Sequence, residues 1–219
     1  MSSAILEPLL RSPELMEHVA ELQRVIALER QRRLKFYEEV TESGKWEFIN
    51  GEAMMQSPAL NRHTAVVGRL VPLLRAHVEP RGLGQVRAEK VLCQFPRNDY
   101  EPDVVFFGLA KSQSILPSTL LHPIPDFIVE VLSPSTSAMD RGVKFDDYAA
   151  HGVGEYWIVD PEAETVEQFF LEHGRYPEAS RQREGVLNSK VIPGLRVPLR
   201  SLFDDEANLK ALRTVLAGT

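Results

Sequence analysis

The sequence contains a single cysteine, Cys93, among its 219 residues. One cysteine cannot form an intramolecular disulfide or supply a cysteine-rich zinc site. Long apolar runs are also lacking, since none approaches the roughly 20 residues that a bilayer-spanning helix needs. Segment 1–7 has neither the basic start nor the apolar core of a secretory signal. We therefore expect a cytoplasmic protein that makes no membrane contact.

An excess of positive charge is missing as well. The formal net charge is −6, which gives no general attraction to nucleic acid, although a local basic groove is compatible with it. No helix-turn-helix or zinc-finger pattern indicates base readout, and no repeat interrupts the chain. The 43% of hydrophobic residues is sufficient for an ordinary core, and the length suits one domain with an appendage.

Hydrophobic patterning predicts an α/β fold with a mixed β-sheet core flanked by helices. Asn50 and Gly51 separate two apolar segments and both tolerate positive φ, which strongly favours a hairpin. Helical spacing predicts helices over 61–78 and 139–150. Strands are predicted over 45–49, 53–56, 85–95, 103–107, 127–132, 155–161 and 165–170, with 186–191 and 195–199 closing the sheet.

The first segment differs in pattern from the remainder of the chain. Residues 13–40 lack glycine, and Leu15, Val19, Leu22 and Ile26 recur at steps of four and three, which predicts a helix beginning near Pro13. Two heptads are too few for a long coiled coil. We expect an N-terminal helical extension over 1–33, a main domain over 34–205 and a C-terminal tail over 206–219.

The same helix becomes basic toward its end. The basic residues are Arg30, Arg32, Arg33 and Lys35. The preferred interpretation is a solvated helix face paired with nearby glutamates. A protein-binding or self-pairing arm is the second interpretation, and contact with nucleic acid is the third.

One apolar strand carries a carboxylate. Glu130 lies between Val129 and Val131 in a segment bounded by prolines. Burying an ionised carboxylate costs several kcal/mol unless a cation or metal compensates. Asp103 lies at the start of a second apolar strand. Two carboxylates on neighbouring strands indicate a site for a hard divalent metal such as Mg²⁺.

Several ordered motifs resemble a known family. They are the segments 46–52 (WEFINGE), 57–58 with His63, 101–103 (EPD), 128–136 (IVEVLSPST), Asp140 with Lys144, and 154–161 (GEYWIVDP). Over about residues 34–203 the chain resembles the Uma family of restriction endonucleases, which belongs to the PD-(D/E)XK nuclease superfamily and is common in cyanobacteria. The resemblance implies a restriction-endonuclease-like fold, a Mg²⁺-dependent endonuclease (Mn²⁺ can substitute) that hydrolyses phosphodiester bonds in DNA, and a homodimer that could pair through the N-terminal helix.

The resemblance also implies roles for individual residues. Asp103 and Glu130 match the first and second acids of the superfamily, both binding the metal beside the scissile phosphate. Glu47 matches an early acid that completes the site from the side. The superfamily places a lysine two residues after the second acid, where this chain has Leu132. Lys144, on the following helix, is the best substitute.

Other residues are supporting candidates with simpler alternatives. Asp140 could orient Lys144 or reach a second metal, although their i,i+4 spacing is also that of an ordinary surface pair. His63 could touch a phosphate or position a ligand, or serve only in capping and packing. Glu52, just past the turn, is a weaker candidate, and Lys90 is a fallback for the missing lysine.

Two alternative functions remain open from the sequence. The domain could be a catalytically lapsed interaction module, or a hydrolase of another phosphoester. The sequence retains Asp103, Glu130 and Lys144, which favours an active enzyme over a catalytically lapsed module.

Overall fold

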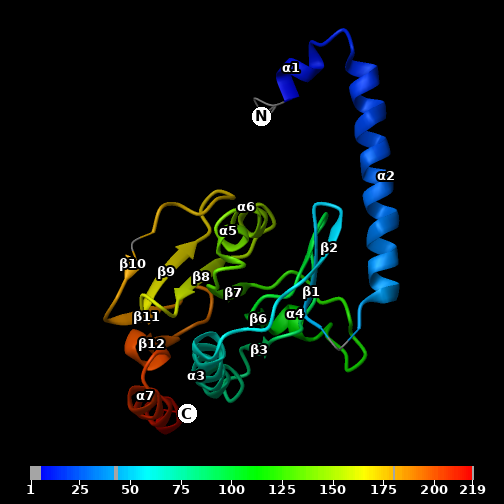
Figure 1. Ribbon diagram of the computed structural model, residues 1–219. Coiled ribbons are helices and arrows are strands. Elements are labelled where there is room, and N and C mark those ends of the chain that lie inside the picture. The colour runs from blue at the N-terminus through cyan, green and yellow to red at the C-terminus, as the bar shows by residue number, and fades with distance from the viewer. Residues whose placement is uncertain (1–5, 42–43, 180, 219) are drawn as a thin grey trace.

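The structure is a computed structural model that describes residues 6–41, 44–179 and 181–218. Residues 1–5, at the start of the expected extension, lie outside the described residues. As the sequence predicts, the fold is α/β with a mixed sheet and flanking helices (Figure 1). In the described parts of the chain, no helix combines the length and apolar character needed to cross a bilayer.

The main sheet has six strands in the order β10-β9-β8-β7-β6-β3. Only the pair formed by β7 and β8 is parallel among the described strands of this sheet. The strands are β3 (Gly84–Ala88), β6 (Val104–Gly108), β7 (Phe127–Val131), β8 (Glu155–Asp160), β9 (Thr165–Phe170) and β10 (Arg181–Gln182).

A second sheet of four strands has the order β2-β1-β5-β4. It contains β1 (Trp46–Ile49), β2 (Glu52–Met55), β4 (Cys93–Gln94) and β5 (Asp99–Tyr100). The predicted hairpin of β1 and β2 is confirmed, with Asn50 and Gly51 at φ of 52° and 86°. Phe48 is buried against Phe36, so strand alternation directs the neighbouring Glu47 to the opposite side.

Helices cover both faces of the main sheet. On one face, α3 (Asn61–Val78) packs its apolar stripe against Val129, Val131 and Trp157. On the other face, α6 (Val143–Ala150) packs Tyr148 against Ile128 and Tyr156. Because successive residues of a strand face opposite sides, Glu130 shares the α6 side with Ile128. This alternation places the Glu130 carboxylate on the side of the sheet where the candidate site lies.

The remaining elements surround these layers. They are α1 (Leu6–Leu10), α2 (Leu15–Glu39), α4 (Leu109–Ser112), α5 (Ser137–Asp140), β11 (Val186–Asn188), β12 (Arg196–Pro198), the 3-10 helix η1 (Leu199–Leu202) and α7 (Asp205–Ala217). The first part of α2 stands away from the body of the molecule (Figure 1).

The structure differs from the prediction in four respects. The last two predicted strands, β11 and β12, pair with each other and do not close the main sheet. The segment 139–150 contains two helices separated at Gly142, where a Cβ would lie 2.8 Å from the Ala138 carbonyl oxygen. In the segment expected as a tail, of which residue 219 lies outside the described residues, α7 packs against α3 and buries Ala211 in the core.

The fourth difference is a break in the strand predicted over 85–95. Glu89 and Lys90 have φ of 55° and 49°, in the left-handed region. This turn lets the chain leave the main sheet after β3 and enter the second sheet at β4. It also places Glu89 at the cavity described below.

The long helix α2 is confirmed, but the boundary expected after residue 33 falls inside it. Its basic end is not uniformly solvated as expected. Arg33 donates to both oxygens of the buried Asp99, with the shortest contact at 2.6 Å, and Tyr37 donates to the same carboxylate. Lys35 does pair with Glu39, as the solvated-face interpretation predicts. The end of α2 is therefore fixed to the main domain.

Candidate active site

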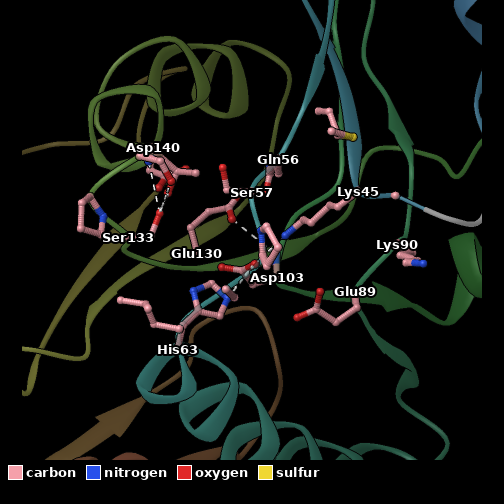
Figure 2. Close-up of a pocket in the computed structure, with 18 of the residues that line it drawn as sticks. Lys45, Gln56, Ser57, His63, Glu89, Lys90, Asp103, Glu130, Ser133 and Asp140 are labelled. Atoms are coloured by element: carbon pink, nitrogen blue, oxygen red, sulfur yellow. Dashed lines mark hydrogen bonds and ion pairs between the residues drawn. The ribbon is translucent and has the colours of Figure 1, made fainter.

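A cavity of about 530 Å³ lies where both sheets and three helices meet. The hairpin, the start of α3, the turn after β3, the strands β6 and β7, and the helices α5 and α6 all contribute residues (Figure 2). Its charged lining residues are Lys45, His63, Glu89, Lys90, Asp103, Glu130, Asp140 and Lys144.

Asp103 immediately precedes β6 and is 2% exposed. Its Oδ1 accepts a hydrogen bond from Lys45 Nζ at 2.6 Å and lies 3.2 Å from His63 Nε2. Its Oδ2 accepts from the Val131 N–H at 2.7 Å, which ties the acid to β7. Burial alone would raise the pKa of Asp103, but His63 and Lys45 hold it well below its usual value. Asp103 is therefore ionised.

Glu130 lies inside β7 and is also 2% exposed. Its Oε1 accepts from Lys144 Nζ at 3.0 Å and from the Tyr148 hydroxyl at 2.9 Å. Its Oε2 lies 3.4 Å from the Asp103 N–H. Burial raises the pKa of Glu130 to about 8, although Lys144 opposes the shift. The positive charge around Glu130 thus does not offset the cost of burying its carboxylate.

Lys144 is 1% exposed and is surrounded by acids. Its Nζ lies 2.9 Å from Glu47 Oε1 and 3.3 Å from Asp140 Oδ1, in addition to Glu130. Burial alone would lower the pKa of Lys144, but the carboxylates hold it well above its usual value. The ammonium is therefore charged, and it links β1, β7, α5 and α6.

Two carboxylate oxygens near Lys144 have incomplete hydrogen bonding. Glu47 Oε2 and Asp140 Oδ1 are buried without a hydrogen-bond partner in the described residues. The ion pair of Asp140 with Lys144 supplies charge but not hydrogen-bond geometry. Burial raises the pKa of Asp140 against the opposing effect of Lys144. The cluster therefore has more acceptor capacity than its lysine satisfies.

Most predicted site residues are brought together. Glu47, His63, Asp103, Glu130, Asp140 and Lys144 lie at or directly behind the cavity. The surface-pair interpretation of Asp140 and Lys144 is wrong, since each is 1% exposed. Glu52 is exposed at the start of β2 and is not one of the lining residues.

Three residues at the site were not predicted: Lys45, Glu89 and Tyr148. For Lys45 the signal was available, because it lies two residues before Glu47 and strand alternation directs both to one side. Burial alone would lower the pKa of Lys45, but Asp103 and Glu130 raise it to about 12. The positive φ of Glu89 has no compositional signal in the sequence.

The buried carboxylates are the residues that could hold a divalent cation. Four buried carboxylates, on Glu47, Asp103, Glu130 and Asp140, face the two ammonium groups of Lys45 and Lys144. Hard cations such as Mg²⁺ select oxygen ligands of this kind. The unpartnered oxygens and the raised pKa of Glu130 are both consistent with missing positive charge.

The mixed sheet, with one acid immediately before β6 and another on the adjacent strand β7, both facing a cavity, is that of a restriction-endonuclease-like domain. The family model Uma2, described as "Putative restriction endonuclease", matches residues 30–200. The chain belongs to this family, as the motifs predicted, and is therefore a nuclease-type hydrolase by class.

One solved structure has the same fold. It is the crystal structure of a "putative nuclease belonging to DUF820" from Anabaena variabilis ATCC 29413, with a TM-score of 0.67 and 18% identity. The match covers 81% of this chain and 96% of that one. No curated protein matches the chain.

Proposed function

We propose that this protein is a Mg²⁺-dependent endonuclease that hydrolyses phosphodiester bonds in DNA. The observation that carries the proposal is the position of Asp103 and Glu130. Asp103 immediately precedes β6 and Glu130 lies on the adjacent strand β7, the Asp103 N–H is 3.4 Å from Glu130 Oε2, and both acids line one cavity. Family membership indicates the reaction class, and these two acids would form the catalytic centre.

Asp103 and Glu130 are the residues that would hold the cation, with Glu47 and Asp140 behind them. A divalent cation bound there supplies positive charge beside the phosphate and lowers the pKa of a bound water. The acids are already fixed for this role. Asp103 is tied to β7 through Val131, and Glu130 is tied to α6 through Lys144 and Tyr148.

The two lysines have different environments and, we propose, different roles. The Lys45 side chain is 17% exposed and has one carboxylate contact, to Asp103. The Lys144 side chain is 1% exposed and has three. Lys45 is therefore the lysine that binds a phosphate oxygen and stabilises charge that develops on it. Lys144 is a positioning residue that holds Glu47, Glu130 and Asp140 together.

The proposal is tested by cleavage of plasmid, linear and single-stranded DNA with Mg²⁺ or Mn²⁺. We expect cation-dependent cleavage that falls by at least about 100-fold in Glu130→Gln. The matched control is Glu52→Gln, which changes an exposed glutamate of the same charge and leaves cleavage unchanged. Full activity in a correctly folded Glu130→Gln protein would contradict the proposal. Cleavage of small phosphodiesters but not DNA would instead favour a hydrolase of another phosphoester.

The role of Lys45 has its own test. We expect Lys45→Met to reduce the turnover number by about 100- to 1,000-fold, comparable to the loss of one charge-stabilising donor. Cation binding should persist because both acids remain. Normal turnover in Lys45→Met would show that Lys45 does not bind the phosphate. The next residue to substitute would then be Lys90, which also lines the cavity.

We also propose that the protein forms a homodimer through α2. One site cuts one strand, so duplex cleavage requires two copies. Leu22 and Ile26 of the heptad stripe are 53% and 48% exposed, and heptad spacing is the pattern by which like helices pair. Light scattering should give a dimer for the unaltered protein and a monomer for Leu22→Glu combined with Ile26→Glu. A monomeric unaltered protein would refute this.

A further inference from the structure

The cavity contains a second group of potential ligands, of which the proposed Mg²⁺ site uses only Asp103. We propose that His63, Glu89 and Asp103 form a second cation site, which takes a transition ion such as Mn²⁺ in preference to Mg²⁺. The inference builds on the proposed function only in sharing Asp103. Figure 2 shows His63 and Glu89 below Asp103 in the view, and Glu130 above it.

The geometry brings three ligand atoms together. One atom from each of His63, Glu89 and Asp103 lies within 4.8 Å of the other two. Ligands about 2.0–2.2 Å from a shared ion are separated by roughly 3–4 Å, so small side-chain rotations suffice to bind one. The three residues come from the first turn of α3, the turn after β3, and the residue before β6. The fold, and not local sequence, therefore holds them together.

The imidazole of His63 supplies the second observation. His63 is 8% exposed, and its Nδ1 is buried without a hydrogen-bond partner in the described residues. Only Nε2 is engaged, at 3.2 Å from Asp103. Buried polar atoms normally have a partner, so the imidazole has bonding capacity that the described residues leave unused, while its Nε2 is directed at Asp103. A metal ion at Glu89 and Asp103 would use the imidazole as its third protein ligand.

The ligand types determine which ion is preferred. Imidazole suits transition ions such as Zn²⁺, Fe²⁺ and Ni²⁺ and is also accepted by Mn²⁺, whereas Mg²⁺ binds almost entirely through oxygen. The pair Asp103 and Glu130 offers only oxygen. The group with His63 adds nitrogen, so the two sites on either side of Asp103 differ in chemistry. Mg²⁺ should occupy the first site readily and the second poorly.

Lys45 competes for this second site. Its Nζ lies 2.6 Å from the same Asp103 Oδ1, so a bound cation and the ammonium repel each other. Lys45→Met should therefore tighten Mn²⁺ binding at the second site. The direction of this change distinguishes a cation site from a hydrogen-bonded cluster, in which loss of Lys45 would create no affinity.

The test is Mn²⁺ titration of the full chain, followed by electron paramagnetic resonance. We expect two Mn²⁺ per chain, with one binding at least about 10-fold more weakly in His63→Ala and in Glu89→Gln. Pulsed measurement should detect a directly bound ¹⁴N, which is lost in His63→Ala. The control is His173→Asn, which changes an exposed histidine outside the cavity and retains the nitrogen signal.

Failure of this inference differs from failure of the proposed function. A Mn²⁺ spectrum without bound nitrogen, or one unchanged in His63→Ala, would overturn the second site, while Mn²⁺ loss in Glu130→Gln would still support the first. If Glu130→Gln alone leaves binding and cleavage intact, the proposed function fails instead. Glu89 is exposed, so Glu89→Gln tests the site even if His63→Ala does not fold. Unchanged Mn²⁺ affinity in a folded Glu89→Gln protein also counts against the inference.

Discussion

Replacing Lys144 with methionine tests the charge balance of the site. The substitution keeps an unbranched chain but leaves Glu47, Glu130 and Asp140 buried without their shared cation. Removing one partner of a buried ion pair typically costs about 3–5 kcal/mol, because the remaining charge is uncompensated. For a domain of this size, each kcal/mol shifts the melting temperature by about 2–4 °C. We therefore expect Lys144→Met to lower it by about 6–20 °C.

The assay is thermal and urea unfolding in EDTA, repeated with Mg²⁺ or Mn²⁺. The control is Lys210→Met, which removes an exposed lysine of α7 and should change stability by no more than about 0.5 kcal/mol. Divalent cations should restore part of the loss in Lys144→Met, because they supply positive charge to the same acids. Adding Glu47→Gln should also recover stability, by about 0.5–3 kcal/mol of coupling. A loss below about 1 kcal/mol, or one indifferent to both changes, would refute the reasoning.

Four further predictions concern the scaffold. Arg33→Met should cost about 3–5 kcal/mol in urea unfolding because it strands the buried Asp99, and a cost near zero would contradict this. Burial raises the pKa of the Cys93 thiol well above its usual value, so a thiol reagent at pH 8 should react only with unfolded protein; rapid native labelling would show otherwise. Gly84→Ala should cost at least about 1–3 kcal/mol, since φ is 147° and its Cβ would lie 2.0 Å from the Phe107 carbonyl oxygen. Gly68→Ala, with nothing within 4 Å, should gain about 0.5–1 kcal/mol in the same thermal unfolding assay.

Local signals account for the elements that the sequence predicted best. The hairpin was predictable because Asn50 and Gly51 need positive φ and flank apolar strands. The helix α3 was predictable because its apolar residues keep helical spacing without interruption. Even α7 carried a usable signal, since Asp204 is an N-cap whose side chain accepts from the Ala207 N–H. Treating that segment as a tail overlooked a capping residue that precedes an apolar pattern.

Tertiary constraints account for the elements that were missed. The break at Glu89 and Lys90 places two non-glycine residues at positive φ, which no propensity favours. The path of the chain between two sheets imposes it. The basic run of α2 showed the same limitation, because only the fold reveals that Asp99 lies opposite Arg33. Composition could identify the charge but not its partner.

The lysine that Leu132 replaces illustrates how the site differs from the parent motif. Leu132 is half-buried and packs against the apolar cluster of Tyr148 and Tyr156, so this position supplies no positive charge to the acids. The positive charge comes instead from two other elements. Lys144 reaches the acids from α6, behind the cavity, while Lys45 reaches Asp103 from the approach to β1. In the proposed function, Lys144 holds the acids together and Lys45 faces the phosphate. Dividing these tasks predicts that Lys144→Met chiefly lowers stability, whereas Lys45→Met chiefly lowers turnover.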